Sequence, residues 1–102
     1  MEVYKTQLFE KWFARIKDRR TRTIIEKRLF RIATDGDFGD IRVISANVSE
    51  LRIDYGPGYR IYLTRKEANV VLLLIGGDKG TQIRDIQIAE RLAKTELTEV
   101  GR

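Results

Sequence analysis

The sequence contains neither cysteine nor histidine. Without cysteine there is no disulfide framework and no thiolate metal site. Without histidine the chain lacks the commonest metal ligand and the usual general base. Any chemistry must therefore use Lys, Arg, Tyr, Asp or Glu side chains or the backbone, and we expect no metal and no cofactor.

Long apolar runs are also missing. The longest, residues 70–75, is far shorter than the roughly 20 residues of a membrane-spanning helix, and the first residues lack the apolar stretch of a signal peptide. We therefore expect a cytoplasmic protein with no membrane partner. The length of 102 residues, 42% of them apolar, predicts one domain over residues 1–102 with a single core, and residues 98–102 are expected to fray.

Negative charge is in short supply, with fifteen Asp and Glu against twenty Lys and Arg, for a formal net charge of +5. Much of the excess lies in residues 11–31. Two interpretations of this basic stretch remain open: it docks on a phosphate backbone, or it is the solvated face of a helix pair. Its candidate RNA-binding residues are Lys17, Arg19, Arg20, Arg22 and Lys27.

The first forty residues predict a strand followed by two helices. Residues 3–5 suit a short strand, and the apolar spacing of residues 9–16 is that of an amphipathic helix. Thr23 and Glu26 have the spacing of a capping box, which predicts that the second helix begins there. The short connection predicts an antiparallel helix hairpin, and the glycine-containing segment 35–40 ends it.

From residue 41 the apolar period changes to two, which predicts antiparallel strands joined by a tight turn at residues 56–58. Residues 70–75 are apolar throughout, as in a central strand covered on both faces, with residues 65–69 as the turn before it. The glycine-rich segment 76–80 should end this strand, and a last helix follows. The order predicts an α+β domain in which the helices pack on one face of a curved, mainly antiparallel sheet and leave the other face free.

Four side chains should share that free face, because residues alternate along a strand: Arg52, Asp54, Arg60 and Tyr62. Two guanidinium groups opposite each other could grip a phosphate and neutralise charge that builds on it. Alternatively, both arginines are solvated and pair with Asp54 or Glu50.

The segment 76–80 lies between a buried strand and a helix, where backbone N–H groups can bind an anion and Lys79 could add a positive charge. The alternative is a plain turn. Asp85, about one helical turn later, could reach the edge of the sheet face and take part in proton transfer. It could equally be a structural acid in the first turn of the helix.

Three sequence blocks occur in order: ELRI at 50–53, YGPGYRIY at 55–62 and LLIGGDK at 73–79, followed by Gln82 and Asp85. Together they resemble the RelE/ParE toxin superfamily, specifically its HigB-like branch of addiction module killer proteins. The resemblance covers nearly the whole chain. It implies a RelE-like fold, with an N-terminal strand and helix hairpin on one face of the sheet and a C-terminal helix.

The resemblance also implies an activity. Members of this superfamily mostly cut mRNA on the ribosome without a metal, when the ribose 2′-OH attacks the adjacent phosphate and leaves a cyclic phosphate and a 5′-hydroxyl. By position, Arg52 and Lys79 are basic catalytic residues and Arg60 stabilises the transition state. Asp85 is a further catalytic candidate for a reason that does not rest on the resemblance: it is a carboxylate near the strand-to-helix segment in a chain without histidine. Arg42 and Tyr62 join the candidate RNA-binding residues.

The implied partners are the ribosome and its mRNA, and a helix-turn-helix antitoxin encoded next to the toxin. Promoter DNA would be bound only through the complex with the antitoxin. The sequence departs from the family pattern in two ways: Asp54 stands where a basic residue is often found, and the C-terminal Tyr or His of some relatives has no counterpart.

Two other functions remain open within this resemblance. One is non-enzymatic growth inhibition through DNA gyrase, as in the ParE-like branch, and the other is a degenerate protein that only binds an antitoxin. The group of Arg52, Arg60 and Lys79 favours the nuclease, since gyrase-directed relatives tend to lack it.

Overall fold

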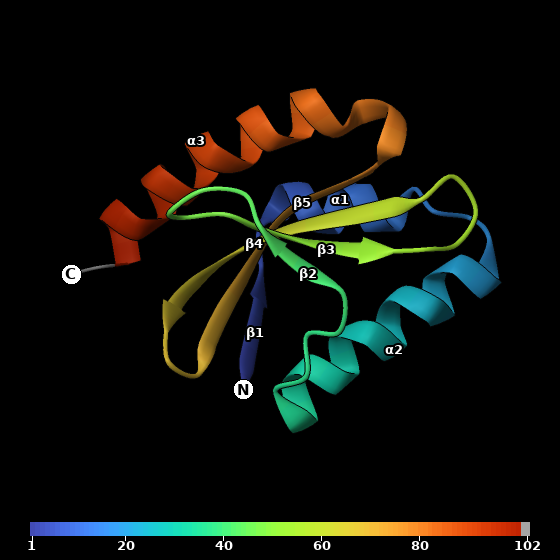
Figure 1. Cartoon of the computed structure of the whole chain (residues 1–102), viewed down its shortest axis with the longest axis horizontal. Coiled ribbons are helices and arrows are strands. Elements are labelled where there is room, and N and C mark those ends of the chain that lie inside the picture. The colour runs from blue at the N-terminus through green and yellow to red at the C-terminus, as the bar shows by residue number, and fades with distance from the viewer. Residues whose placement is uncertain (101–102) are drawn as a thin grey trace.

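The computed structural model describes the backbone of residues 1–100 and the side chains of residues 1–95. Five strands form one mixed sheet in the order β1-β5-β4-β3-β2, in which β1 runs parallel to β5 and the other neighbours are antiparallel (Figure 1). The predicted α+β class is therefore confirmed. The elements are β1 (Glu2–Lys5), α1 (Gln7–Ala14), α2 (Arg19–Asp35), β2 (Ile41–Val43), β3 (Ser49–Ile53), β4 (Tyr59–Glu67), β5 (Val70–Asp78), a short 3-10 helix (Lys79–Thr81) and α3 (Gln82–Val100).

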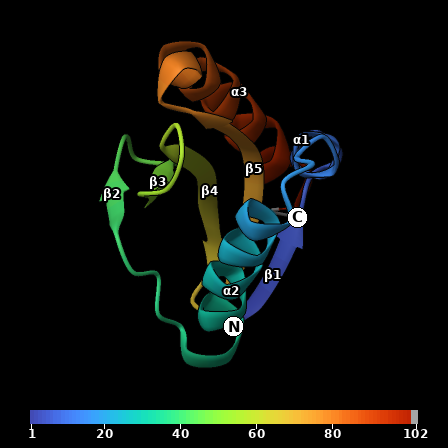
Figure 2. The same ribbon diagram turned by 90° about the vertical axis from the view of Figure 1, so that its right-hand side faces the viewer.

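The helices cover both faces of the sheet. In Figures 1 and 2, α3 lies on the opposite side of the strands from α2. Phe9 of α1 and Ile25 of α2 belong to one core cluster with Leu73 of β5, while Ala89 and Ala93 of α3 pack with Leu74 in a second cluster. The prediction of a single core, with all helices on one face, is therefore wrong.

The cause is the fully apolar strand β5. Its successive side chains point to opposite faces, so Leu73 and Leu74 require a cover on each side. The predicted burial of this strand on both faces is confirmed, and β5 is bonded to a neighbour at both edges. The small side chains of Ala89 and Ala93 allow α3 to lie close to the second face.

The second helix begins earlier than predicted. The α2 helix begins at Arg19, because Asp18 is its N-cap and accepts a hydrogen bond from the backbone N–H of Thr21 at 3.1 Å. Thr23 and Glu26 lie inside the helix and form no capping box at its start. Gly36 ends α2 in the left-handed conformation, with φ of 66°, which glycine adopts without strain.

Two strands are longer than predicted. Strand β4 continues to Glu67, so only Ala68 and Asn69 remain in the turn before β5. Strand β5 continues through both glycines to Asp78, so the segment 76–80 does not end the strand at residue 76. Fraying was expected for residues 98–102. The backbone of residues 98–100 belongs to α3, whereas residues 101–102 lie outside the described residues.

Within the described residues, no helix combines the length and the apolar character needed to cross a lipid bilayer.

Candidate active site

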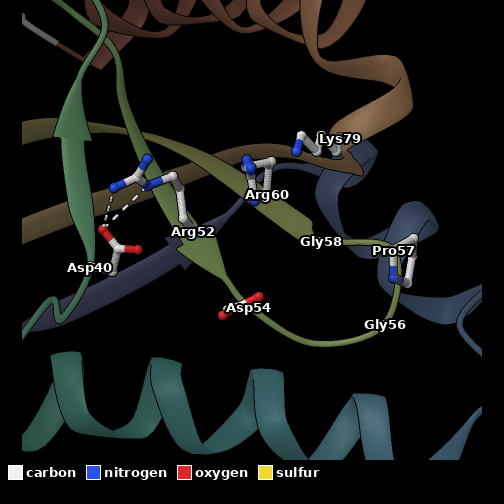
Figure 3. Close-up of a pocket in the computed structure, with 8 residues that line it drawn as sticks. All are labelled: Asp40, Arg52, Asp54, Gly56, Pro57, Gly58, Arg60 and Lys79. Carbon is white, nitrogen blue, oxygen red and sulfur yellow. Dashed lines mark hydrogen bonds and ion pairs between the residues drawn. The ribbon is translucent and has the colours of Figure 1, made fainter.

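An open pocket lies where the β3–β4 hairpin meets the end of β5 (Figure 3). Its volume of about 450 Å³ falls in the range of roughly 300–1,000 Å³ that small-molecule sites occupy. Three cations from three different elements contribute to its wall. The lining residues are Asp40, Arg52, Asp54, Gly56, Pro57, Gly58, Arg60 and Lys79.

The strand register brings the three cations together. Arg52 on β3 is the direct cross-strand partner of Arg60 on β4, and Arg60 is in turn the partner of Gly77 on β5. Lys79 follows β5 at the first position of the 3-10 helix. The sequence therefore predicted correctly that Arg52 and Arg60 lie opposite each other, and Lys79 lines the same pocket.

The hairpin turn that forms the pocket rim depends on two glycines. Gly56 and Gly58 have φ angles of 58° and 81°, which L side chains rarely adopt, and Pro57 fixes the residue between them. The predicted tight turn is confirmed.

Arg52 is held by a carboxylate that the sequence analysis did not single out. Its Nε and Nη2 atoms donate to Oδ1 of Asp40 at 3.2 and 2.9 Å (Figure 3). This hydrogen bonding, followed by the charge of Asp40, raises the pKa of Arg52 above its usual value. Asp40 is thus the partner of Arg52, in place of the Asp54 or Glu50 considered from the sequence.

Arg60 is the most enclosed cation of the pocket, with a side chain 13% exposed. Its Nη1 atom donates to the carbonyl oxygen of Tyr59 at 3.3 Å, and its Nε lies 4.0 Å from Oε2 of Glu50. The alternative interpretation is therefore confirmed in pairing Arg60 with Glu50 and wrong in describing Arg60 as solvated.

The carboxylates of the pocket are Asp40 and Asp54. Asp54 makes no hydrogen bond or ion pair with the described residues, so its oxygens are available to a ligand. Among those residues, no group of three or more acidic side chains is placed to share a metal ion.

Asp85 is not part of this pocket. Its side chain is buried above Gly77, where Oδ2 accepts a hydrogen bond from the hydroxyl of Thr81 at 2.5 Å and Oδ1 lies 3.5 Å from Nε of Arg84. Of the two alternatives considered from the sequence, the structural acid in the first turn of α3 fits these contacts, because α3 turns Asp85 inward onto β5.

Tyr62 is not available to stack on an RNA base. It is completely buried under α3, and its hydroxyl donates to Oε2 of Glu50 at 3.0 Å. Burial, followed by this hydrogen bond and the charge of Glu50, raises the pKa of Tyr62 far above its usual value. The alternation of side chains along the strand predicted that Tyr62 lies on a free face. This prediction is wrong, because α3 covers that part of the face.

Of the remaining candidate RNA-binding residues, two lie close to other groups of the protein and four are exposed. Arg42 on β2 is half exposed and lies 3.3 Å from Oε1 of Glu50. Arg22 is engaged in the fold, because its Nη1 donates to the carbonyl oxygens of Phe13 at 2.8 Å and Ile16 at 3.2 Å at the end of α1. The other four are exposed: Lys17, Arg19, Arg20 and Lys27.

The glycines of the GGDK block serve close packing. A Cβ at position 76 would overlap the ring of Trp12, and a Cβ at position 77 would overlap the carboxylate of Asp85. Asp78 then starts the 3-10 helix by accepting a hydrogen bond from the N–H of Gly80 at 2.8 Å. Gly76 and Gly77 therefore continue a strand between two layers and belong to neither an anion-binding loop nor a plain turn, the two alternatives considered from the sequence.

Comparison with known proteins identifies a relative in Haemophilus influenzae (strain ATCC 51907 / DSM 11121 / KW20 / Rd), described as an uncharacterized protein. The two sequences are 40% identical over 94 residues, which cover 92% of this chain and 94% of the relative. The chain belongs to the family of this Haemophilus protein. No family model matches the sequence.

Proposed function

We propose that this protein is the toxin of a type II toxin-antitoxin module with the RelE-like fold, a cytoplasmic, HigB-like member of the RelE/ParE superfamily that cuts mRNA on the ribosome without a metal. The observation that carries the proposal is the convergence of Arg52, Arg60 and Lys79 on one open pocket. Three cations from separate elements in one concave site suit a phosphodiester whose charge rises during reaction.

In this proposal the scissile phosphate lies between the three cations. The 2′-oxygen attacks phosphorus as its proton passes to Asp54, the bond to the 5′-oxygen breaks, and that oxygen leaves with a proton from Lys79. Arg60 and Arg52 stabilise the charge on the non-bridging oxygens. Asp85 has no part in the reaction, because it is buried outside the pocket.

The exposed cations of α2 and of the segment just before it support a second contact with RNA. Arg19, Arg20 and Lys27 lie along α2, and Lys17 precedes that helix. We assign them, with Arg42, to phosphate-backbone binding that does not depend on base sequence. The proposed partners are the ribosome, mRNA and an adjacently encoded helix-turn-helix antitoxin, through which the complex would bind promoter DNA.

The test is to map RNA 5′ ends after brief expression of the wild-type chain and of Arg60→Ala. We expect new breaks within translated mRNA from the wild type. We expect Arg60→Ala to reduce cleavage about 100-fold or more, because it removes an electrostatic stabiliser. Arg91→Ala is the matched control, since it removes the same charge from an exposed position on α3 outside the pocket.

Other outcomes select other functions. Growth arrest without new RNA ends, but with gyrase-dependent DNA breaks, would indicate the gyrase-directed alternative. Harmless expression at high level, together with binding to the product of an adjacent reading frame, would indicate a degenerate antitoxin-binding protein.

A further inference from the structure

A buried carboxylate lies beside the pocket, at a position to which the sequence analysis gave no role in the reaction. Glu50 on β3 is 0% exposed, between the sheet and α3. Burial of a carboxylate is strongly unfavourable unless partners compensate for the lost water. The arrangement around Glu50 therefore calls for an explanation.

Two neutral donors fix the orientation of this carboxylate. The hydroxyl of Tyr62 and Nε2 of Gln82 donate to the same oxygen, Oε2, at 3.0 and 2.8 Å. Tyr62 comes from β4, and Gln82 is the first residue of α3. Glu50 is thus tied both to its neighbouring strand and to the helix that covers it.

Two arginines flank the same carboxylate. Nη2 of Arg42 lies 3.3 Å from Oε1, and Nε of Arg60 lies 4.0 Å from Oε2. Arg42 is half exposed, whereas Arg60 is nearly enclosed. The negative charge of Glu50 therefore acts on a cation that reaches from the buried layer into the pocket.

Arg60 has few other restraints. Apart from the carbonyl of Tyr59 at 3.3 Å, the described residues give it no hydrogen bond, and its buried Nε has none. Its neighbours in the pocket include the cations Arg52 and Lys79, and Asp40 is already bonded to Arg52. Asp54 also lines the pocket but forms no ion pair with Arg60, so among the described residues Glu50 is the carboxylate that pairs with this enclosed cation.

Stability alone does not account for Glu50. A buried ion pair is often no more stabilising than well-packed apolar side chains of the same volume. What an apolar residue could not supply is a fixed negative charge behind the guanidinium of Arg60. The need for a negative charge at position 50 therefore distinguishes a role in the pocket from a role in packing.

We propose that Glu50 is a positioning residue, which holds the guanidinium of Arg60 in the pocket. The consequence for the reaction rests on the proposed nuclease function, whereas the effect on Arg60 itself does not. Small displacements of a group that stabilises the transition state reduce the rate steeply. Loss of the charge of Glu50 should therefore lower kcat more than it raises KM.

The first experiment measures the position of Arg60 without any RNA. In ¹⁵N-labelled protein, the Nε–H resonance of Arg60 is assigned by its loss in Arg60→Ala. We expect Glu50→Gln to shift this resonance and to increase its mobility, because the amide can still accept hydrogen bonds but carries no charge. Glu67→Gln, an exposed substitution at the end of the same β4 strand as Arg60, is the control and should leave the resonance unchanged.

The second experiment is a double-mutant cycle, read by single-turnover cleavage of mRNA on programmed ribosomes. We expect Glu50→Gln to lower kcat about 10-fold or more, with a change in KM below about 3-fold. In the Arg60→Ala background, Glu50→Gln should change kcat by less than about 2-fold, because its effect passes through Arg60.

The outcomes separate the two proposals. An unchanged Arg60 resonance in folded Glu50→Gln overturns the positioning role, as does an equal loss of kcat with and without Arg60. If Glu50→Gln does not fold, Tyr62→Phe takes its place, because it removes one of the two neutral donors to Glu50. We expect Tyr62→Phe to move the Arg60 resonance in the same direction, and no movement overturns the positioning role of Glu50. Absence of cleavage by the wild type refutes the nuclease alone, since the resonance still reports on Glu50.

Discussion

Arginine side chains have very different environments in this chain. Arg28 donates from Nε, Nη1 and Nη2 to the carbonyl oxygens of Phe38, Arg52 and Asp40, at 2.9, 2.8 and 2.8 Å. These three bonds tie α2 to the segment that precedes β2 and to strand β3, and burial is the first cause that lowers the pKa of Arg28. Arg60 lies beside a buried carboxylate, and Arg52 pairs with a surface one. The excess of basic residues thus combines fixed structural groups with pocket cations, and only part of it is available to an anionic ligand.

The raised pKa of Tyr62 predicts how stability changes at high pH. In the unfolded chain this phenol loses its proton near pH 10, whereas in the folded protein burial and Glu50 keep it protonated to higher pH. The stabilisation is complete below pH 10 and falls as pH rises above it, because only the unfolded state then releases the proton. We expect the free energy of unfolding to fall less steeply in Tyr62→Phe than in the wild type.

Urea unfolding at pH 8 and pH 10.5 measures this difference. All other ionisable groups are the same in both proteins, so the comparison isolates Tyr62. Equal losses of stability in the two proteins would contradict the prediction.

Among the secondary-structure elements, β5 is the one on which both layers depend. Its apolar part supports α1 on one face and α3 on the other, and its last three residues lead to the pocket at Lys79. At the glycine pair, Trp12 from α1 covers Gly76 and Asp85 from α3 covers Gly77. The pocket is therefore adjacent to the point where both helical layers lie directly on the strand backbone.

Gly76→Ala tests this close approach. The added methyl group would overlap the rigid ring of Trp12, which cannot move away without disturbing the core, and we expect a loss of about 1–3 kcal/mol in the free energy of unfolding. Gly80→Ala is the matched control: its Cβ would meet only Oδ1 of Asp78 at 3.2 Å, and we expect a change of less than about 1 kcal/mol. Equal effects in a urea titration would show that Trp12 does not limit the size of residue 76.

The strands and their register were largely predictable, because alternation and the glycine-proline turn are local signals. They placed Arg52 opposite Arg60 correctly. The position of α3 was not predictable in the same way, since its apolar stripe fits either face of the sheet, and Tyr62 was misplaced as a result. The position of Glu50 was predictable from the sequence. In the predicted hairpin Glu50 lies opposite Tyr62 and on the same face as Arg52, and this places its carboxylate beside the arginines.

At the scale of the whole molecule, the strands of the sheet differ in how far they are shielded from water. The interior strands β4 and β5 are bonded on both edges and largely covered on both faces, while β2 is a three-residue edge strand with an exposed Val43. We expect amide hydrogen exchange to be slowest in residues 61–64 and 71–75 and fastest, among the strands, in β2.

Exchange followed by mass spectrometry on the intact protein tests this order. The backbone N–H of Arg52, which donates to the carbonyl of Asp40 at 2.9 Å, should exchange at an intermediate rate. Protection of β2 equal to that of β5 would mean that the whole sheet opens in a single step.

The glycine pair of β5 also constrains how the sequence can diverge. A relative with a larger residue at position 76 has room for it only if position 12 carries a smaller side chain than tryptophan, and a larger residue at position 77 requires the loss or retraction of the acid at position 85. Positions 12 and 76, and positions 77 and 85, should therefore vary as linked pairs. Asp85, which has no place in the proposed chemistry, would then be retained together with glycine at position 77 in relatives with and without the proposed activity.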